Sequence, residues 1–76
     1  MPSTDIARRI AELDEQIADT ESRIFQHQKR VENLEARGAD ASDLRDVIKT
    51  LGETLADLRT HRQKLAQQAQ QGPSRK

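Results

Sequence analysis

Core-type residues recur along the first half of the chain at alternating intervals of four and three residues. This spacing is typical of the a and d positions of a coiled-coil heptad, and it runs through Ile6, Ile10, Leu13, Ile17, Thr20, Ile24, His27, Val31 and Leu34. After a break at residues 38–40, the spacing resumes through Leu44, Ile48, Leu51, Leu55, Leu58, Arg62, Leu65 and Ala69. The pattern predicts an all-α protein, an antiparallel two-helix coiled-coil hairpin.

Residues that favour helix ends divide the hairpin into segments. We expect a leader at 1–4, a first helix at 5–37, a loop at 38–41, a second helix at 42–70 and a flexible basic tail at 71–76. Ser3 or Thr4 is expected to cap the first helix, and Gly38 suits the left-handed residue that follows a helix end. Asp40 or Ser42 is expected to cap the second helix.

Charges balance overall but are arranged in blocks. The chain has 13 basic and 13 acidic residues, so no net field directs it towards nucleic acid or membrane. Acidic residues dominate 5–21 and 40–57, whereas basic residues dominate 22–37 and are the only charged residues from Arg59 onward. Folding at Gly38 places each acidic block beside a basic one, which favours the antiparallel hairpin over an extended rod.

Composition excludes several kinds of function. The chain of 76 residues has no cysteine and one aromatic residue, Phe25, which excludes disulfides, thiol catalysis and sulfur-ligated metals. Its apolar residues never form a run long enough for a membrane-spanning helix, and we expect a cytoplasmic protein. A two-helix seam offers no pocket that could desolvate a substrate, so we expect neither enzymatic activity nor a cofactor.

Three polar residues, Thr20, His27 and Arg62, occupy core positions. We interpret them as a polar core layer that fixes the alignment of the helices, with Thr20 beside Arg62. His27 could instead bind a metal or change its charge near neutral pH. However, His61 lies on a different side of its helix, and two histidines do not supply the three or four ligands of a metal site. We therefore expect no metal.

Further small and apolar residues recur every seven residues outside the predicted seam. They are Ala11, Ala18 and Phe25 at b positions of the first helix, and Val47, Thr54 and His61 at g positions of the second. A hairpin closed only on itself needs a and d alone, whereas a four-helix bundle needs a wider apolar face. We expect these residues to form a second interface through which two hairpins pair; the alternative is that the alanines are only good helix formers.

These features favour a non-enzymatic coiled-coil module for protein–protein interaction and oligomerisation. Its expected partner is a second copy of the chain, which would give a homodimer, or another helical protein. The alternative is an adaptor or regulatory hairpin that stays monomeric until a larger protein covers Phe25. A weaker alternative is nucleic-acid binding through the basic C-terminal end, which carries Arg59, Arg62, Lys64, Arg75 and Lys76 but has no aromatic platform for stacking bases. We expect no membrane partner and no small-molecule substrate.

Part of the chain is similar to a group of short bacterial proteins. The similarity lies in three segments: isoleucine, glutamine, valine and Leu-Glu positions within 24–40, the segment 51–55, and the basic segment 61–65. It covers about two thirds of the chain, from 17 to 65. That group has no assigned activity, so the resemblance implies a bacterial, cytoplasmic coiled-coil module and supplies no functional residues. The chain is more loosely similar to the small SlyX-like coiled-coil proteins, whose proline-rich ending it lacks.

Overall fold

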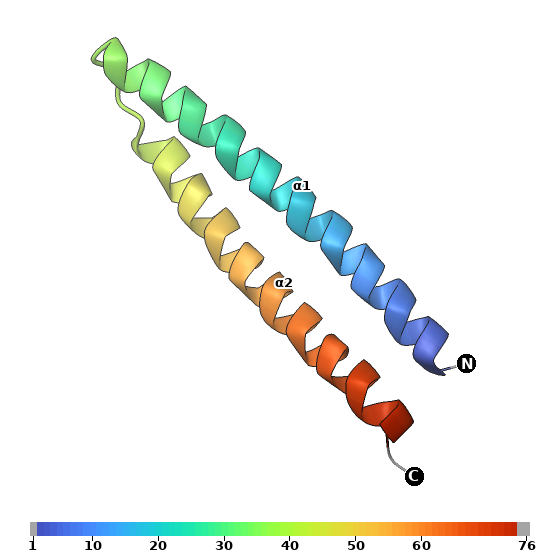
Figure 1. Cartoon of the computed structure of the whole chain (residues 1–76). Coiled ribbons are helices and arrows are strands. Elements are labelled where there is room, and N and C mark those ends of the chain that lie inside the picture. Colours follow the sequence, from blue (N-terminus) through green and yellow to red (C-terminus); the bar gives the residue numbers. More distant parts are fainter. Residues whose placement is uncertain (1, 75–76) are drawn as a thin grey trace.

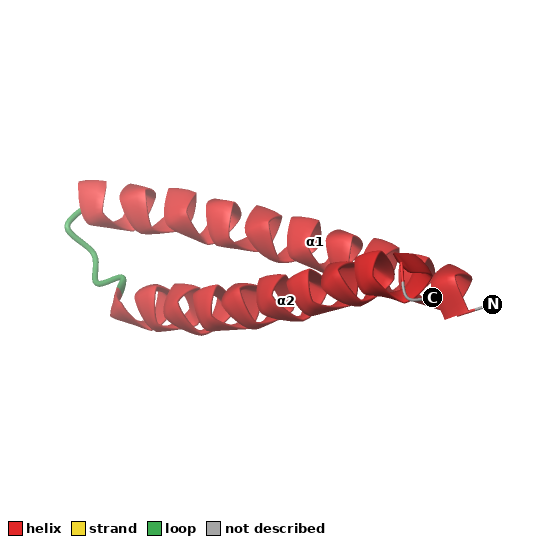
Figure 2. Cartoon of the chain, turned by 60° about the horizontal axis from the view of Figure 1, so that its bottom comes forward, coloured by secondary structure: helices red, strands yellow, loops and turns green. Residues whose placement is uncertain are grey.

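The structure, a computed structural model, describes residues 2–74. It consists of two α-helices, α1 (Pro2–Ala36) and α2 (Ser42–Ser74), which lie side by side and antiparallel (Figure 1). Residues 37–41 connect them at one end (Figure 2), and the hairpin is a rod of 62 × 15 × 12 Å. The predicted all-α helical hairpin is confirmed.

The seam between the helices follows the predicted heptad. From residue 5 to residue 70, every predicted a and d position is buried or half-buried, and every other residue except Ala41 and Ala66 is exposed. Ala41 lies seven residues before Ile48, so it occupies an additional a position of the same heptad. The pattern of burial therefore establishes the heptad frame in both helices.

The core of the hairpin is thin. Within the described part of the chain, the buried residues are Leu13, Thr20, Val31, Ala41 and Leu65, and no side chain there is fully enclosed. The other a and d side chains stay half-exposed, because two helices cover a seam residue only from one side. A core of this size gives a chain of this length little stability on its own.

The first helix begins earlier than predicted. It starts at Pro2 rather than at residue 5 and ends at Ala36, so Ser3 and Thr4 lie within its first turn and the predicted leader is wrong from residue 2 onward. Proline favours the first turn of a helix because its fixed φ is helical and its missing N–H would have no partner there. Met1 lies outside the described residues.

The second helix extends further than predicted. It begins at Ser42, as expected, but continues to Ser74 instead of ending at residue 70, so residues 71–74 of the predicted flexible tail are helical. Glutamine and alanine, which fill 66–71, favour helix. Arg75 and Lys76 lie outside the described residues.

Gly38 ends α1 in the predicted way. Its φ is 77°; the Ala39 N–H donates to the Leu34 carbonyl at 2.8 Å, and the Gly38 N–H donates to the Glu35 carbonyl at 3.0 Å. These two bonds form a Schellman motif, which satisfies two carbonyl groups that the helix end would leave unpaired. An L-residue would be strained at this φ although the space beside it is free.

Asp40 caps α2. Its Oδ1 accepts a hydrogen bond from the Ser42 N–H at 3.0 Å, and its Oδ2 accepts one from the Ser42 hydroxyl at 3.0 Å. The bond from the Ser42 N–H, followed by the bond from the hydroxyl, lowers the pKa of Asp40. Of the two expected caps, Asp40 is thus the acceptor and Ser42 is the first helical residue.

Candidate interaction site

Two of the three polar core residues, Thr20 and Arg62, form hydrogen bonds, each with a different partner. Thr20 is buried, and its hydroxyl donates to the Gln16 carbonyl of the same helix at 2.8 Å. Arg62 leaves the seam at its edge, where its Nε donates to Asp14 Oδ1 at 2.5 Å; this bond and then the charge of Asp14 raise the pKa of Arg62. The expected layer of Thr20 beside Arg62 is therefore corrected, because the long arginine side chain reaches a carboxylate near solvent.

His27 lies at the seam as predicted, but one of its ring nitrogens is unsatisfied. The side chain is half-buried, and its Nδ1 is buried without a hydrogen-bond partner. A buried polar atom of this kind costs about 1–3 kcal/mol. Among the described residues, no group of three or more histidine, cysteine, aspartate or glutamate side chains could hold a metal ion.

Ion pairs define which edges of the two helices meet. Glu21 pairs with Arg59 at 2.5 Å, and Glu35 pairs with Arg45; all four residues occupy e positions. We call this side of the hairpin the e face and the opposite side, along which the g positions lie, the g face. The Glu21–Arg59 pair also confirms that the acidic block of α1 lies beside the basic end of α2.

These two ion pairs were not predicted as individual contacts. The signal was present in the sequence, since acidic residues occupy e positions of the first helix and arginines occupy e positions of the second. Which acidic residue meets which arginine depends on the alignment of the two helices along the rod, and the heptad pattern alone does not determine that alignment. We expected Thr20 beside Arg62, whereas Arg62 binds Asp14, which lies six residues before Thr20 in α1.

The row of ion pairs on the e face is interrupted at Gly52. Gln28 lies seven residues from both Glu21 and Glu35, and Gly52 lies seven residues from both Arg45 and Arg59, so both residues occupy e positions between the residues of the two ion pairs. Glycine in a helix interior costs about 1 kcal/mol relative to alanine. A Cβ at Gly52 would meet nothing within 4 Å, so packing within the hairpin does not require this glycine.

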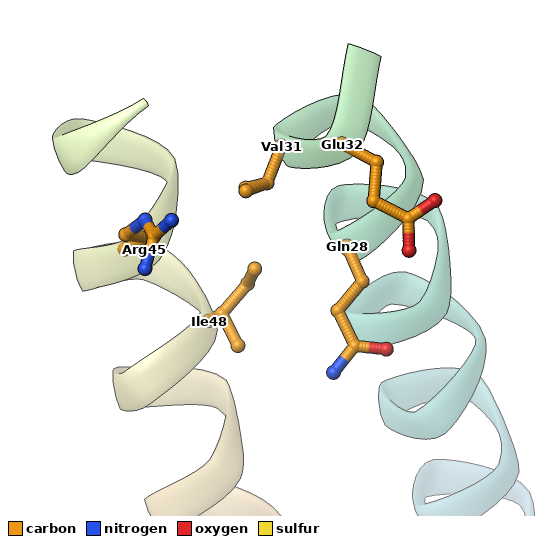
Figure 3. A pocket seen from close by; sticks show the side chains of 5 residues that line it. All are labelled: Gln28, Val31, Glu32, Arg45 and Ile48. Atoms are coloured by element: carbon orange, nitrogen blue, oxygen red, sulfur yellow. The ribbon is translucent and has the colours of Figure 1, made fainter. Parts of the chain in front are cut away.

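A hollow of about 390 Å³ lies on the e face beside this interruption, towards the loop (Figure 3). It is lined by Gln28, Val31, Glu32, Arg45 and Ile48. Val31 and Ile48 point towards each other from the two helices (Figure 3), so the floor of the hollow is the apolar seam. The hollow exposes part of the core on the e face.

Phe25 borders the e face and is largely exposed. Its exposed fraction is 59%, and the Lys29 Nζ lies 5.2 Å from the centroid of its ring. Ala11 and Ala18 are exposed at the preceding b positions of α1, which adjoin the e positions around the helix. The three residues therefore form one row beside the e face.

Val47 and its heptad equivalents lie on the other side of the hairpin. Val47 is 42% exposed, and Thr54 and His61 are exposed on the same g row. A separate hollow brings His61 together with Gln16, another g residue. All six residues of the predicted second interface are thus exposed, but they form two rows on opposite faces, and the expectation of one common surface is corrected.

Comparison of the chain with family models, with curated proteins and with solved structures finds no match. Within the described residues, neither helix has the length and apolar content needed to cross a membrane.

Proposed function

We propose that this hairpin is a non-enzymatic coiled-coil module for protein–protein interaction and that its partner is a second copy of the chain, in a four-helix bundle. The observation that carries the proposal is the thin core beside two large exposed apolar side chains, Phe25 and Val47. Most seam residues are only half-buried in one hairpin. A second pair of helices would cover their open side.

The distribution of charge supports antiparallel neighbours in this bundle. The acidic part of α1 already pairs with the basic part of α2 through Asp14–Arg62 and Glu21–Arg59. A helix from a second copy, placed antiparallel to its neighbours, would repeat this complementarity, whereas a parallel neighbour of the same kind would oppose like charges. Self-association therefore uses the charge arrangement that closes each hairpin.

The dependence of thermal stability on protein concentration tests this proposal. If folding is coupled to dimerisation, a 100-fold increase in protein concentration should raise the Tm by roughly 10 °C. Circular dichroism melts between micromolar and sub-millimolar concentrations measure this shift. A Tm that does not change with concentration would contradict self-association and would favour an adaptor that needs a different protein as partner.

A further inference from the structure

We propose, on the basis of the self-association proposed above, that two hairpins pair through their e faces about a two-fold axis parallel to the rod. In this arrangement, Phe25 of each copy packs over Gly52 of the other copy. The e face is then the dimer interface, and the mid-helix glycine has a role that it does not have in the single hairpin.

The positions of Phe25 and Gly52 along the rod carry the geometry. The Glu21–Arg59 pair sets Gly52 level with residue 28 of α1, and the Asp14–Arg62 pair sets it level with residue 24. Phe25 lies between these two levels, so it stands within about one helical turn of Gly52 along the rod. A two-fold axis parallel to the rod keeps heights unchanged and places α1 of one copy over α2 of the other. Phe25 then arrives within about one helical turn of Gly52 of the second copy.

The positions around Gly52 have the spacing that receives a side chain in helix packing, and we call them the hole. Lys49, Gly52, Glu53 and Ala56 stand at the i, i+3, i+4 and i+7 positions that surround a knob in helix packing. All four are exposed, and two of them are small. Because Gly52 has no side chain and nothing lies within 4 Å of the place of its Cβ, the helix surface there is open to an aromatic ring from a neighbouring helix.

Charge complementarity favours a second copy as the occupant of this hole. The Lys29 ammonium group lies beside the Phe25 ring and would arrive together with it between Glu53, which attracts it, and Lys49 on the opposite side of Gly52. The arrangement also sets α1 antiparallel to α2 of the other copy at equal height, which repeats the acidic-to-basic pairing seen within one hairpin. An interface that maps onto itself by a two-fold axis buries both phenylalanines and covers both glycines.

Dissociation constants of the dimer, measured by sedimentation equilibrium on the full chain, test this inference. Gly52→Gln fills the hole while improving helix propensity, so it should not unfold the hairpin. We expect Gly52→Gln to raise the dissociation constant of the dimer by at least about 10-fold. Phe25→Ala should have an effect of the same size, because it removes a buried aromatic anchor. The matched control is Thr54→Gln on the g face, which should change the constant by less than about 2-fold.

A double variant distinguishes contact from coincidence. If Phe25 packs over Gly52 of the other copy, Phe25→Ala combined with Gly52→Gln should weaken the dimer no more than the more damaging single change, because neighbouring changes are not additive. Additive effects, unchanged dimerisation of Gly52→Gln, or an equal loss in Thr54→Gln would each overturn this arrangement while leaving self-association intact. A wild-type chain that is monomeric at every concentration would overturn the proposed function itself.

Discussion

His27 combines a core position with a buried nitrogen that has no hydrogen-bond partner. Replacing it by leucine removes the unsatisfied atom and adds apolar surface to the seam. We expect His27→Leu to stabilise the fold by about 1 kcal/mol, measured by urea denaturation at a fixed protein concentration. His61→Leu, at an exposed position, is the control and should change stability by less than about 0.5 kcal/mol. A destabilised His27→Leu would mean that the imidazole makes a contact that the leucine loses.

The backbone conformation at the end of α1 explains why residue 38 is a glycine. Its φ of 77° is open to glycine and tolerated by asparagine but strained for alanine. Gly38→Ala should therefore destabilise the hairpin by about 1 kcal/mol, and Gly38→Asn should cost less than that. Urea denaturation of the two variants checks the order. Equal stability of both variants with wild type would show that the chain can end α1 without this left-handed residue.

At the scale of the element, the cap of α2 predicts a dependence on pH. The ordinary pKa of an aspartate is 3.8, and the hydrogen bonds from Ser42 lower the pKa of Asp40 below it. The stabilisation is therefore fully present above the ordinary pKa and is lost as the pH falls through the lower, folded-state value. Asp40→Asn keeps an acceptor oxygen but does not titrate.

The stability difference between wild type and Asp40→Asn isolates this contribution from those of the other carboxylates. We expect the stability difference to be constant above about pH 5. Below about pH 4, the wild type should lose stability relative to Asp40→Asn. Denaturation curves from pH 2 to pH 7 measure it. A difference that stays the same over that whole range would mean that Asp40 is not the titrating cap.

The heptad frame predicts which helix positions tolerate substitution. Leu51 is a half-buried d residue, whereas Lys64 is exposed on the outside of the same helix. Leu51→Ala should destabilise the fold by at least about 2 kcal/mol, and Lys64→Ala should cost less than about 0.5 kcal/mol. Thermal melts of the two variants compare them directly. Similar losses at both sites would contradict the assigned frame.

The elements themselves could be predicted from the sequence because burial follows a strict period. Apolar side chains at a and d positions determined the seam, and Gly38 and Asp40 marked the turn. The helix ends were predicted less well, since Pro2 suits the first turn of a helix and the glutamines and alanines of 66–71 favour continuation of the second helix. Local signals of this kind depend on the neighbouring residues and on which backbone groups already have partners.

At the scale of the whole molecule, the faces of the hairpin could not be assigned from the heptad alone. The period places Phe25 and Val47 outside the seam, but it does not say which edges of the two helices meet. That depends on the alignment of α1 and α2, which the pairs of Glu21 with Arg59 and Glu35 with Arg45 establish. For the same reason, the prediction treated the Phe25 and Val47 rows as one surface although they lie on opposite faces.

Small-angle X-ray scattering of the wild-type chain over a range of concentrations tests the central claim, self-association side by side, most directly. Forward scattering gives the mass, and the distance distribution gives the length. We expect a mass of twice 8.6 kDa with a maximum dimension that stays close to the 62 Å of one hairpin, because paired hairpins of equal height lengthen little. A mass of 8.6 kDa at every concentration, or a dimer nearly twice as long, would contradict the account.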